Sequence, residues 1–117
     1  MIAVGDHYWG KAPEILIRAS CPFAGGVGGS REELCGVLSG GTILLGALRG
    51  RTSYQENDEA VRTLSDEFRK RFIAMAGSAQ CKAVRDSLPD VYKRCAPIVE
   101  QGTRILMELL EEVPEEE

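Results

Sequence analysis

Four cysteines, Cys21, Cys35, Cys81 and Cys95, are the residues of this 117-residue chain best suited to redox or metal chemistry. A cysteine thiolate can attack a disulfide, be oxidised or bind a soft metal ion. The four lie 14, 46 and 14 residues apart, so the chain has no Cys-x-x-Cys motif. The spacing alone therefore does not indicate a zinc ribbon or a thioredoxin-type site. A single cysteine is best interpreted as a small buried hydrophobic residue, but four in so short a chain favour a function.

A glycine-rich loop precedes Cys35 and contains Gly25, Gly26, Gly28 and Gly29. Glycine adopts positive φ easily and lets the backbone approach another group closely. We therefore predict a tight turn here, and the four glycines are candidate cofactor-binding residues whose N–H groups could approach a cysteine sulfur or a cluster. The loop lacks the lysine and hydroxyl pair of a P-loop, so nucleotide binding is not expected. A helix–helix turn without any ligand is the structural alternative.

The helix after this loop is predicted to organise the fold. Ser30 and Glu33 have the spacing of a capping box, which predicts a helix from Arg31 to Leu48 with Cys35 in its second turn. Apolar residues surround this segment almost completely, so we expect it to be the buried central helix of an all-α bundle. A thiol near a helix N-terminus is favoured as a thiolate, and this applies to Cys35.

The remaining helices should surround the central one. Periodic apolar residues, prolines and glycines predict helical segments at 1–8, from about 13 to 21, 58–76, 78–86 with Ser78 as its cap, and a last helix running to about 110 or 113. Pro97 fits best in the first turn of the last helix, because a proline deep in a helix costs roughly 3 kcal/mol. Cys95 then lies at or just before that helix, where a thiolate is again favoured.

Composition excludes several classes of function. The formal net charge is −4 and no long basic run is present, so nucleic-acid binding is not expected. No apolar run approaches the roughly 20 residues of a membrane span, and the first residues do not resemble a signal peptide. We therefore expect a cytoplasmic protein, in which cysteines are more often free, metal-bound or redox-active than joined in structural disulfides. His7, the single histidine, could be a fourth ligand beside three thiolates, but an exposed role is favoured.

Residues 23–41, followed by Ile-Leu-Leu-Gly and Arg-Gly-Arg, resemble the core of the C-GCAxxG-C-C family of proposed redox-active proteins. The segments around Cys81 and Cys95 match the two downstream cysteines of the family in order and context, so the resemblance covers nearly the whole chain. It implies a small all-helical domain similar to the cysteine-bearing domain of split-Soret cytochromes. It also implies an iron–sulfur cluster or another thiolate-bound metal, with Cys35, Cys81 and Cys95 as the matched redox thiols and ligands.

The chain departs from this family in two places. It begins inside a segment that follows the family's first cysteine, so the N-terminal helix carrying that cysteine is expected to be missing. Relatives usually have Ala, Ser or Thr where Cys21 stands, so Cys21 either replaces the lost ligand or is incidental. A missing helix would expose apolar surface, which favours a homodimer.

Together these observations predict one helical domain over residues 1–117. The first hypothesis is a thiol-based redox or electron-transfer protein that works with an unidentified redox partner, either as an oxidoreductase or as an electron carrier. The second hypothesis is a non-catalytic helical interaction module in which the cysteines only pack. The positions of Cys35, Cys81 and Cys95 relative to one another discriminate between the two hypotheses.

Overall fold

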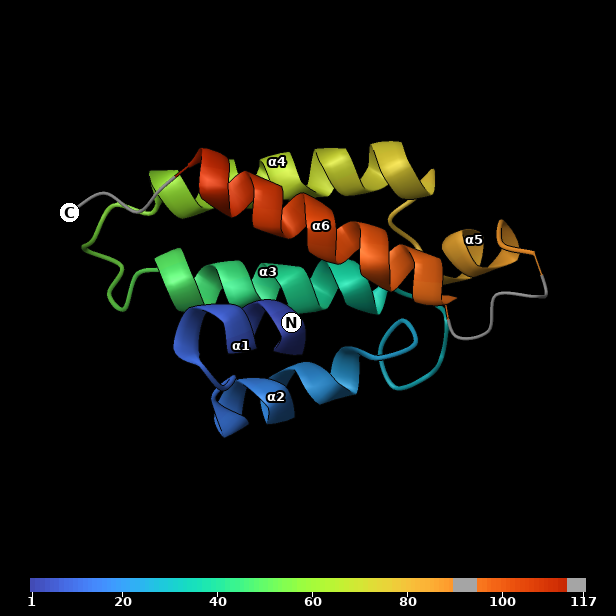
Figure 1. The fold of residues 1–117 in the computed structure, drawn as a ribbon, viewed down its shortest axis with the longest axis horizontal. Helices are drawn as coiled ribbons and strands as arrows, with labels where there is room; N and C mark the ends of the chain where they lie inside the picture. Colours follow the sequence, from blue (N-terminus) through green and yellow to red (C-terminus); the bar gives the residue numbers. More distant parts are fainter. Residues whose placement is uncertain (90–94, 114–117) are drawn as a thin grey trace.

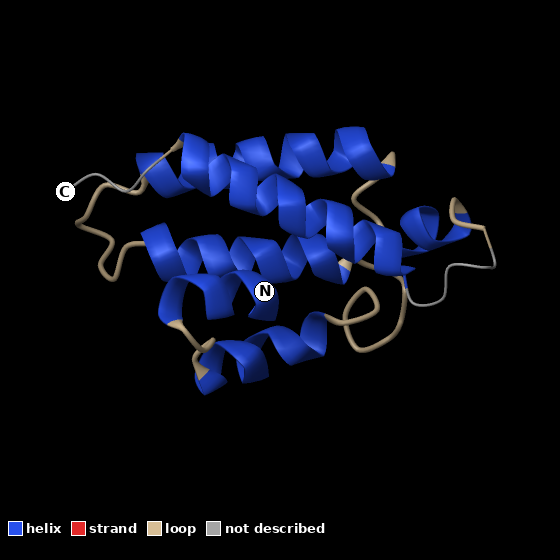
Figure 2. Ribbon diagram, in the orientation of Figure 1, coloured by secondary structure: helices blue, strands red, loops and turns tan. Residues whose placement is uncertain are grey.

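The computed structural model describes residues 1–89 and 95–113, and within these ranges every regular element is a helix (Figure 2). The helices are α1 (Ile2–Trp9), α2 (Glu14–Ser20), the short 3₁₀ helix η1 (Cys21–Phe23), α3 (Gly36–Arg49), α4 (Glu59–Ala76), α5 (Cys81–Asp86) and α6 (Ala96–Glu112). The predicted all-α fold is confirmed. No helix in the described ranges is long and apolar enough to cross a membrane.

Helix α3 occupies the centre of the bundle. It lies between α4 and α6 on one side and α1 and α2 on the other (Figure 1), and it packs directly against α2, α4 and α6. Leu44 and Leu45 are completely buried and Leu38 is nearly so. Each fully buried leucine contributes roughly 1.5–3 kcal/mol relative to an exposed one. The prediction of a buried central helix is therefore confirmed.

The predicted start of this helix at Arg31 is wrong, because α3 begins at Gly36. The capping box does not form: the Ser30 hydroxyl donates to the Gly26 carbonyl and accepts from the N–H of Glu32. Arg31 has a φ of 64°, which a right-handed helix cannot contain. Cys35 is consequently the N-cap of α3 and does not lie in its second turn.

Helices α4 and α6 form the layer that covers one side of α3. In α4, the buried residues Leu64, Phe68, Phe72 and Ala76 recur every four residues, which places them on one face. The helix ends at Gly77, whose φ of 84° makes a left-handed cap. The predicted helix at 58–76 is confirmed, with residue 58 as its N-cap.

Small residues let these helices approach α3 closely. A Cβ atom added at Gly41 of α3 would lie 2.5 Å from the ring of Phe68 in α4, closer than real Cβ contacts allow. A Cβ added at Gly102 of α6 would collide with Val37 of α3. The glycines in these two helices therefore have a packing reason that compensates for their poor helix propensity.

The start of the short helix α5 also differs from expectation. Gln80 is its N-cap, and the Ser78 hydroxyl instead accepts a hydrogen bond from the N–H of Gln80. Pro97 lies in the first turn of α6, as predicted, and Cys95 is the N-cap of that helix.

Candidate functional site

Two short segments, one before α3 and one before α5, run antiparallel and hold two cysteines near each other. The N–H of Cys35 donates to the carbonyl of Ala79 at 2.8 Å, and the N–H of Cys81 donates to the carbonyl of Glu33 at 2.9 Å. These bonds flank an isolated antiparallel bridge between residues 34 and 80. Cysteines separated by 46 residues in the sequence are thereby brought into one backbone pairing.

The register of this pairing places the two thiols on the same face. Cys35 lies opposite Ala79, and Cys81 is two residues further along. Residues two apart in an extended segment point to the same side, so Cys35 and Cys81 are diagonal neighbours. Diagonal neighbours in antiparallel pairs are about 7–8 Å apart, with Cβ atoms somewhat closer.

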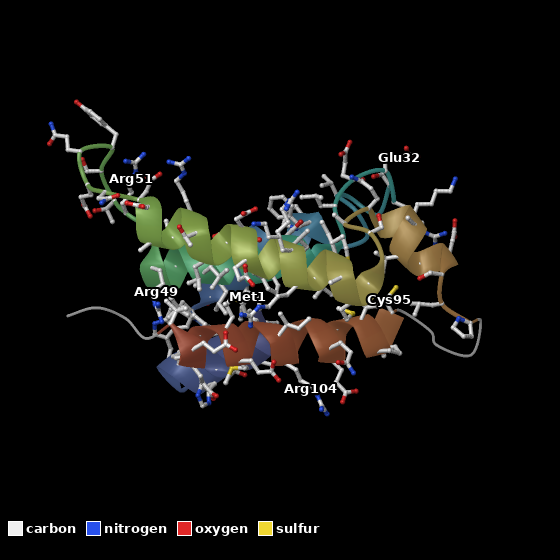
Figure 3. The ribbon with its side chains drawn as sticks, turned by 90° about the horizontal axis from the view of Figure 1, so that it is seen from above. Met1, Glu32, Arg49, Arg51, Cys95 and Arg104 are labelled. Atoms are coloured by element: carbon white, nitrogen blue, oxygen red, sulfur yellow. The ribbon has the colours of Figure 1, made fainter. Side chains whose placement is uncertain are left out.

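Cys95 is the N-cap of α6, as Cys35 is the N-cap of α3. It lies at the end of the bundle that carries α5 (Figure 3). Its φ of 58° is unusual for a residue with a side chain. Cys95 is half-buried, whereas Cys35 and Cys81 are buried and Cys21 is exposed. Each of the four is a free thiol.

All four cysteines line one cavity of about 680 Å³. Its walls come mainly from the start of α1, the end of α2, the first half of α3, and α6. Of the four glycines predicted to bind a cofactor, Gly25 lines this cavity, whereas Gly26, Gly28 and Gly29 do not. Cys21 is outside the antiparallel pairing, and it is grouped with the other three cysteines only because it lines the same cavity.

The glycine loop supports Cys81 by close backbone contact. Gly25, Gly26, Gly28 and Gly29 have φ values of 65°, 71°, 62° and 72°, which confirms the predicted unusual turn. A Cβ added at Gly26 would lie 2.7 Å from the Cβ of Cys81. The loop therefore reaches Cys81 because residue 26 has no side chain. A role for the glycines in binding a cofactor stays a prediction.

Burial raises the pKa of the Cys35 thiol above its ordinary value. The N–H groups of Val37 and Leu38 in the first turn of α3 oppose this shift, whereas negative charge on Cys81 or Cys95 adds to it. The prediction that the helix start favours a thiolate at Cys35 is therefore wrong, because the loss of hydration outweighs the helix terminus.

Comparison with models of known protein families shows which family this chain belongs to. Residues 1–109 match the family model described as "Putative redox-active protein (C_GCAxxG_C_C)". The chain belongs to the C-GCAxxG-C-C family. Comparisons with curated proteins and with solved structures found no match. The C-GCAxxG-C-C family is described as redox-active, and in this member all four cysteines line one cavity.

A metal centre is not evident in this arrangement of the C-GCAxxG-C-C fold. Within residues 1–89 and 95–113, no three Cys, His, Asp or Glu side chains are close enough to bind one metal ion together. His7 lies in α1, is exposed and does not line the cavity. No metal or cluster is shown, and the metal site implied by the resemblance stays a prediction.

Sequence reasoning missed two features of the site. The pairing of Cys35 with Cys81 depends on backbone bonds between distant segments, and no local motif signals it. Arg85, one helical turn after Cys81, lines the cavity as well. Its position on α5 follows the four-residue helical repeat, but nothing in the sequence indicates that this face of α5 borders a cavity.

The raised pKa of Cys35 predicts a loss of stability in alkaline solution. In the unfolded chain a cysteine ionises near pH 8.5, whereas Cys35 in the folded protein stays protonated to higher pH. The unfolded state then binds fewer protons, so the free energy of unfolding falls as pH rises above about 8.5. Denaturant unfolding from pH 7 to 9.5 should show a smaller fall in Cys35→Ser, since serine does not ionise. Equal slopes in both proteins would contradict the raised pKa.

Proposed function

We propose that this protein is a thiol-based redox protein in which Cys35, Cys81 and Cys95 are the redox thiols and Cys35 and Cys81 form the reversible disulfide. The observation that carries the proposal is the antiparallel register that puts Cys35 and Cys81 on one face. Membership in the C-GCAxxG-C-C family supports redox activity in general, and the register supports the choice of Cys35 and Cys81 as the pair that closes.

The proposed reaction is thiol–disulfide exchange with an oxidised partner that carries a disulfide. The thiolate of one cysteine attacks a partner sulfur, which breaks the partner's S–S bond and releases one partner thiol. The second cysteine attacks the mixed disulfide and releases the other partner thiol. The two protons lost by Cys35 and Cys81 pass to the two partner sulfurs. Two electrons thus move from the protein to its partner, and the reverse reaction reduces the protein.

The environment of the thiols tunes this reaction. The raised pKa of Cys35 keeps it protonated and limits its reaction with general oxidants. Cys95 is less buried than Cys35 and Cys81 and also lines the cavity, so we assign it the first attack on the partner disulfide. Cys81 or Cys35 then attacks Cys95 and releases the second partner thiol, and the remaining cysteine displaces Cys95 as a thiol, so the two electrons still come from the Cys35–Cys81 pair. The Cβ atoms in a disulfide are about 3.5–4.5 Å apart. The two segments are already hydrogen-bonded to each other, so closing the diagonal pair requires a local backbone change at Cys35 and Cys81.

The proposal is tested by oxidising the reduced protein with oxidised glutathione and mapping the disulfides by mass spectrometry without reduction. Wild-type protein should lose two free thiols and yield a peptide pair linked through Cys35 and Cys81. Cys35→Ser and Cys81→Ser should each abolish this link. Cys21→Ser is the matched control, because Cys21 is exposed and lies outside the antiparallel pairing, and it should leave the link unchanged.

The same preparations test the alternatives. If all four thiols react with glutathione independently and no internal link forms, the redox pair is wrong and a helical interaction module with packing cysteines becomes the better interpretation. Iron and zinc analysis of protein purified without air tests the metal prediction. Stoichiometric metal that Cys35→Ser, Cys81→Ser and Cys95→Ser each remove would replace the dithiol proposal with a thiolate-metal centre.

A further inference from the structure

The cavity is the route by which a reaction partner reaches the buried thiols. Only 5% of Cys35 and 8% of Cys81 is exposed, and both line the cavity together with the half-buried Cys95. A molecule that exchanges with these thiols therefore meets them inside the cavity. The cavity volume of about 680 Å³ is within the range of small-molecule sites, which is roughly 300–1,000 Å³. A small molecule thus fits where the surface of a folded protein does not.

The wall of the cavity is mostly apolar. Ile17 of α2, Phe68 of α4, and Val99 and Leu106 of α6 all contribute to it. A polar group that enters such a space gives up its hydrogen bonds to water, and each group that stays unpaired weakens binding. A ligand with apolar substituents avoids this loss, and its own burial is favourable.

The charged groups of the wall do not fix the position of a charged ligand. Among the described residues that line the cavity, these groups are the guanidinium of Arg85 on α5 and the α-amino group of Met1, which lies beside Gly40 of α3. Arg85 is exposed to solvent, and burial lowers the pKa of the Met1 amino group. None of the described lining residues supplies a carboxylate that could pair with a cation. The wall therefore suits an uncharged ligand.

The mixed disulfide places a further demand on the partner. After the first attack, one half of the partner disulfide is bonded to the sulfur of Cys95, and Cys95 lines the cavity. This half stays beside the cavity wall until Cys35 or Cys81 attacks Cys95. The exchange is therefore favoured when this half packs against apolar side chains.

We propose that the oxidised partner is a small, uncharged disulfide with aliphatic substituents, which enters the cavity. This inference rests on the proposed function, because it names the substrate of the Cys35–Cys81 pair. The S–S bond of a dialkyl disulfide breaks and the S–S bond between Cys35 and Cys81 forms. The substrate is reduced to two alkanethiols while the two cysteines are oxidised, and the two thiol protons pass to the two alkyl sulfur atoms.

Two disulfides of nearly the same size test this substrate class. They are dipropyl disulfide and hydroxyethyl disulfide, in which a hydroxyl replaces each terminal methyl group. Reduced full-length protein is mixed with each disulfide, and formation of the Cys35–Cys81 link is followed by mass spectrometry. Each rate is divided by the rate of the same disulfide with free cysteine, which removes the difference in intrinsic reactivity. The normalised rate should be about 10-fold higher for dipropyl disulfide, because burial of its terminal methyl groups is favourable.

Two pairs of variants test whether the cavity causes this preference. Gly40 lines the cavity, and a Cβ there would meet only Met1, at 3.6 Å, so Gly40→Leu should fill the cavity and abolish the preference. Gly46→Leu, in the same helix but outside the cavity and with open space around it, should keep it. Val99→Ser changes a wall residue that is 49% exposed and should lower the preference about 3-fold. Val113→Ser, at a similarly exposed valine outside the cavity, should not. Circular dichroism checks that each variant retains its helices.

The possible failures are distinguishable. Equal normalised rates for the two disulfides in the wild type would overturn the apolar substrate and leave the Cys35–Cys81 pair standing. A loss of preference in Gly46→Leu as large as in Gly40→Leu would place the selectivity outside the cavity. A disulfide-bonded protein such as oxidised thioredoxin, if it formed the link faster than dipropyl disulfide at the same concentration, would make the partner a protein. If neither small disulfide forms the link, the proposed function fails together with this inference.

Discussion

Phe68→Ala should lower the free energy of unfolding by about 3–5 kcal/mol, the range for removing a buried aromatic side chain. Phe68 is completely buried in α4, and its ring lies directly over the glycine at position 41 in α3. Removing the ring therefore opens a void at the contact between α3 and α4, two helices that pack extensively against each other. Denaturant unfolding followed by circular dichroism measures the loss. A loss below about 1 kcal/mol would show that α4 does not pack on α3 as described.

The contact itself is tested by a double-mutant cycle with Gly41→Ala. In the wild type, the added methyl group collides with the Phe68 ring, so Gly41→Ala should destabilise the protein by about 1–3 kcal/mol. In the Phe68→Ala background the ring is absent, and the same change should be neutral or stabilising because alanine favours helix by about 1 kcal/mol over glycine. Gly40→Ala is the matched control, since its Cβ makes an ordinary 3.6 Å contact. Additive effects of Gly41→Ala and Phe68→Ala would contradict the contact.

The helices were predictable where apolar residues repeat with a clear helical period. The segment 58–76 matches α4 almost to the residue, because four buried side chains at four-residue spacing and a terminal glycine define it locally. The start of α3 was not predictable in this way. The Ser30–Glu33 pattern is a local signal, whereas positive φ at Arg31 and pairing of the preceding backbone with residues 79–81 are consequences of the tertiary fold.

The candidate site was predictable by residue type but not by geometry. Cysteines and glycines were visible in the sequence, and the turn that the glycines form was correctly expected from their freedom at positive φ. The pKa of Cys35 was expected in the wrong direction, because the helix terminus is a local feature and burial is not. The pairing of Cys35 with Cys81 depends on the register between two segments that are 46 residues apart in the sequence. No local sequence pattern predicts such a long-range register.

Gly26→Ala should both destabilise the protein and disturb Cys81. Position 26 has a φ of 71°, and a residue with a side chain pays roughly 1–2 kcal/mol for this conformation. The new methyl group would also lie 2.7 Å from the Cβ of Cys81, and overpacking of this kind costs a further 1–3 kcal/mol or so. We expect a total loss of about 2–4 kcal/mol in denaturant unfolding. Disulfide formation between Cys35 and Cys81 by oxidised glutathione should change in rate, because the contact that positions Cys81 is altered.

Gly28→Ala separates the two causes of this loss. Its φ of 62° is nearly the same, but a Cβ at position 28 meets nothing within 4 Å. Gly28→Ala should therefore show only the conformational cost of about 1–2 kcal/mol and leave the rate of disulfide formation unchanged. The difference between the two variants measures what the contact with Cys81 contributes. If both variants lose the same stability and oxidise at the wild-type rate, the glycine loop does not hold Cys81 in place, and its glycines serve only the shape of the turn.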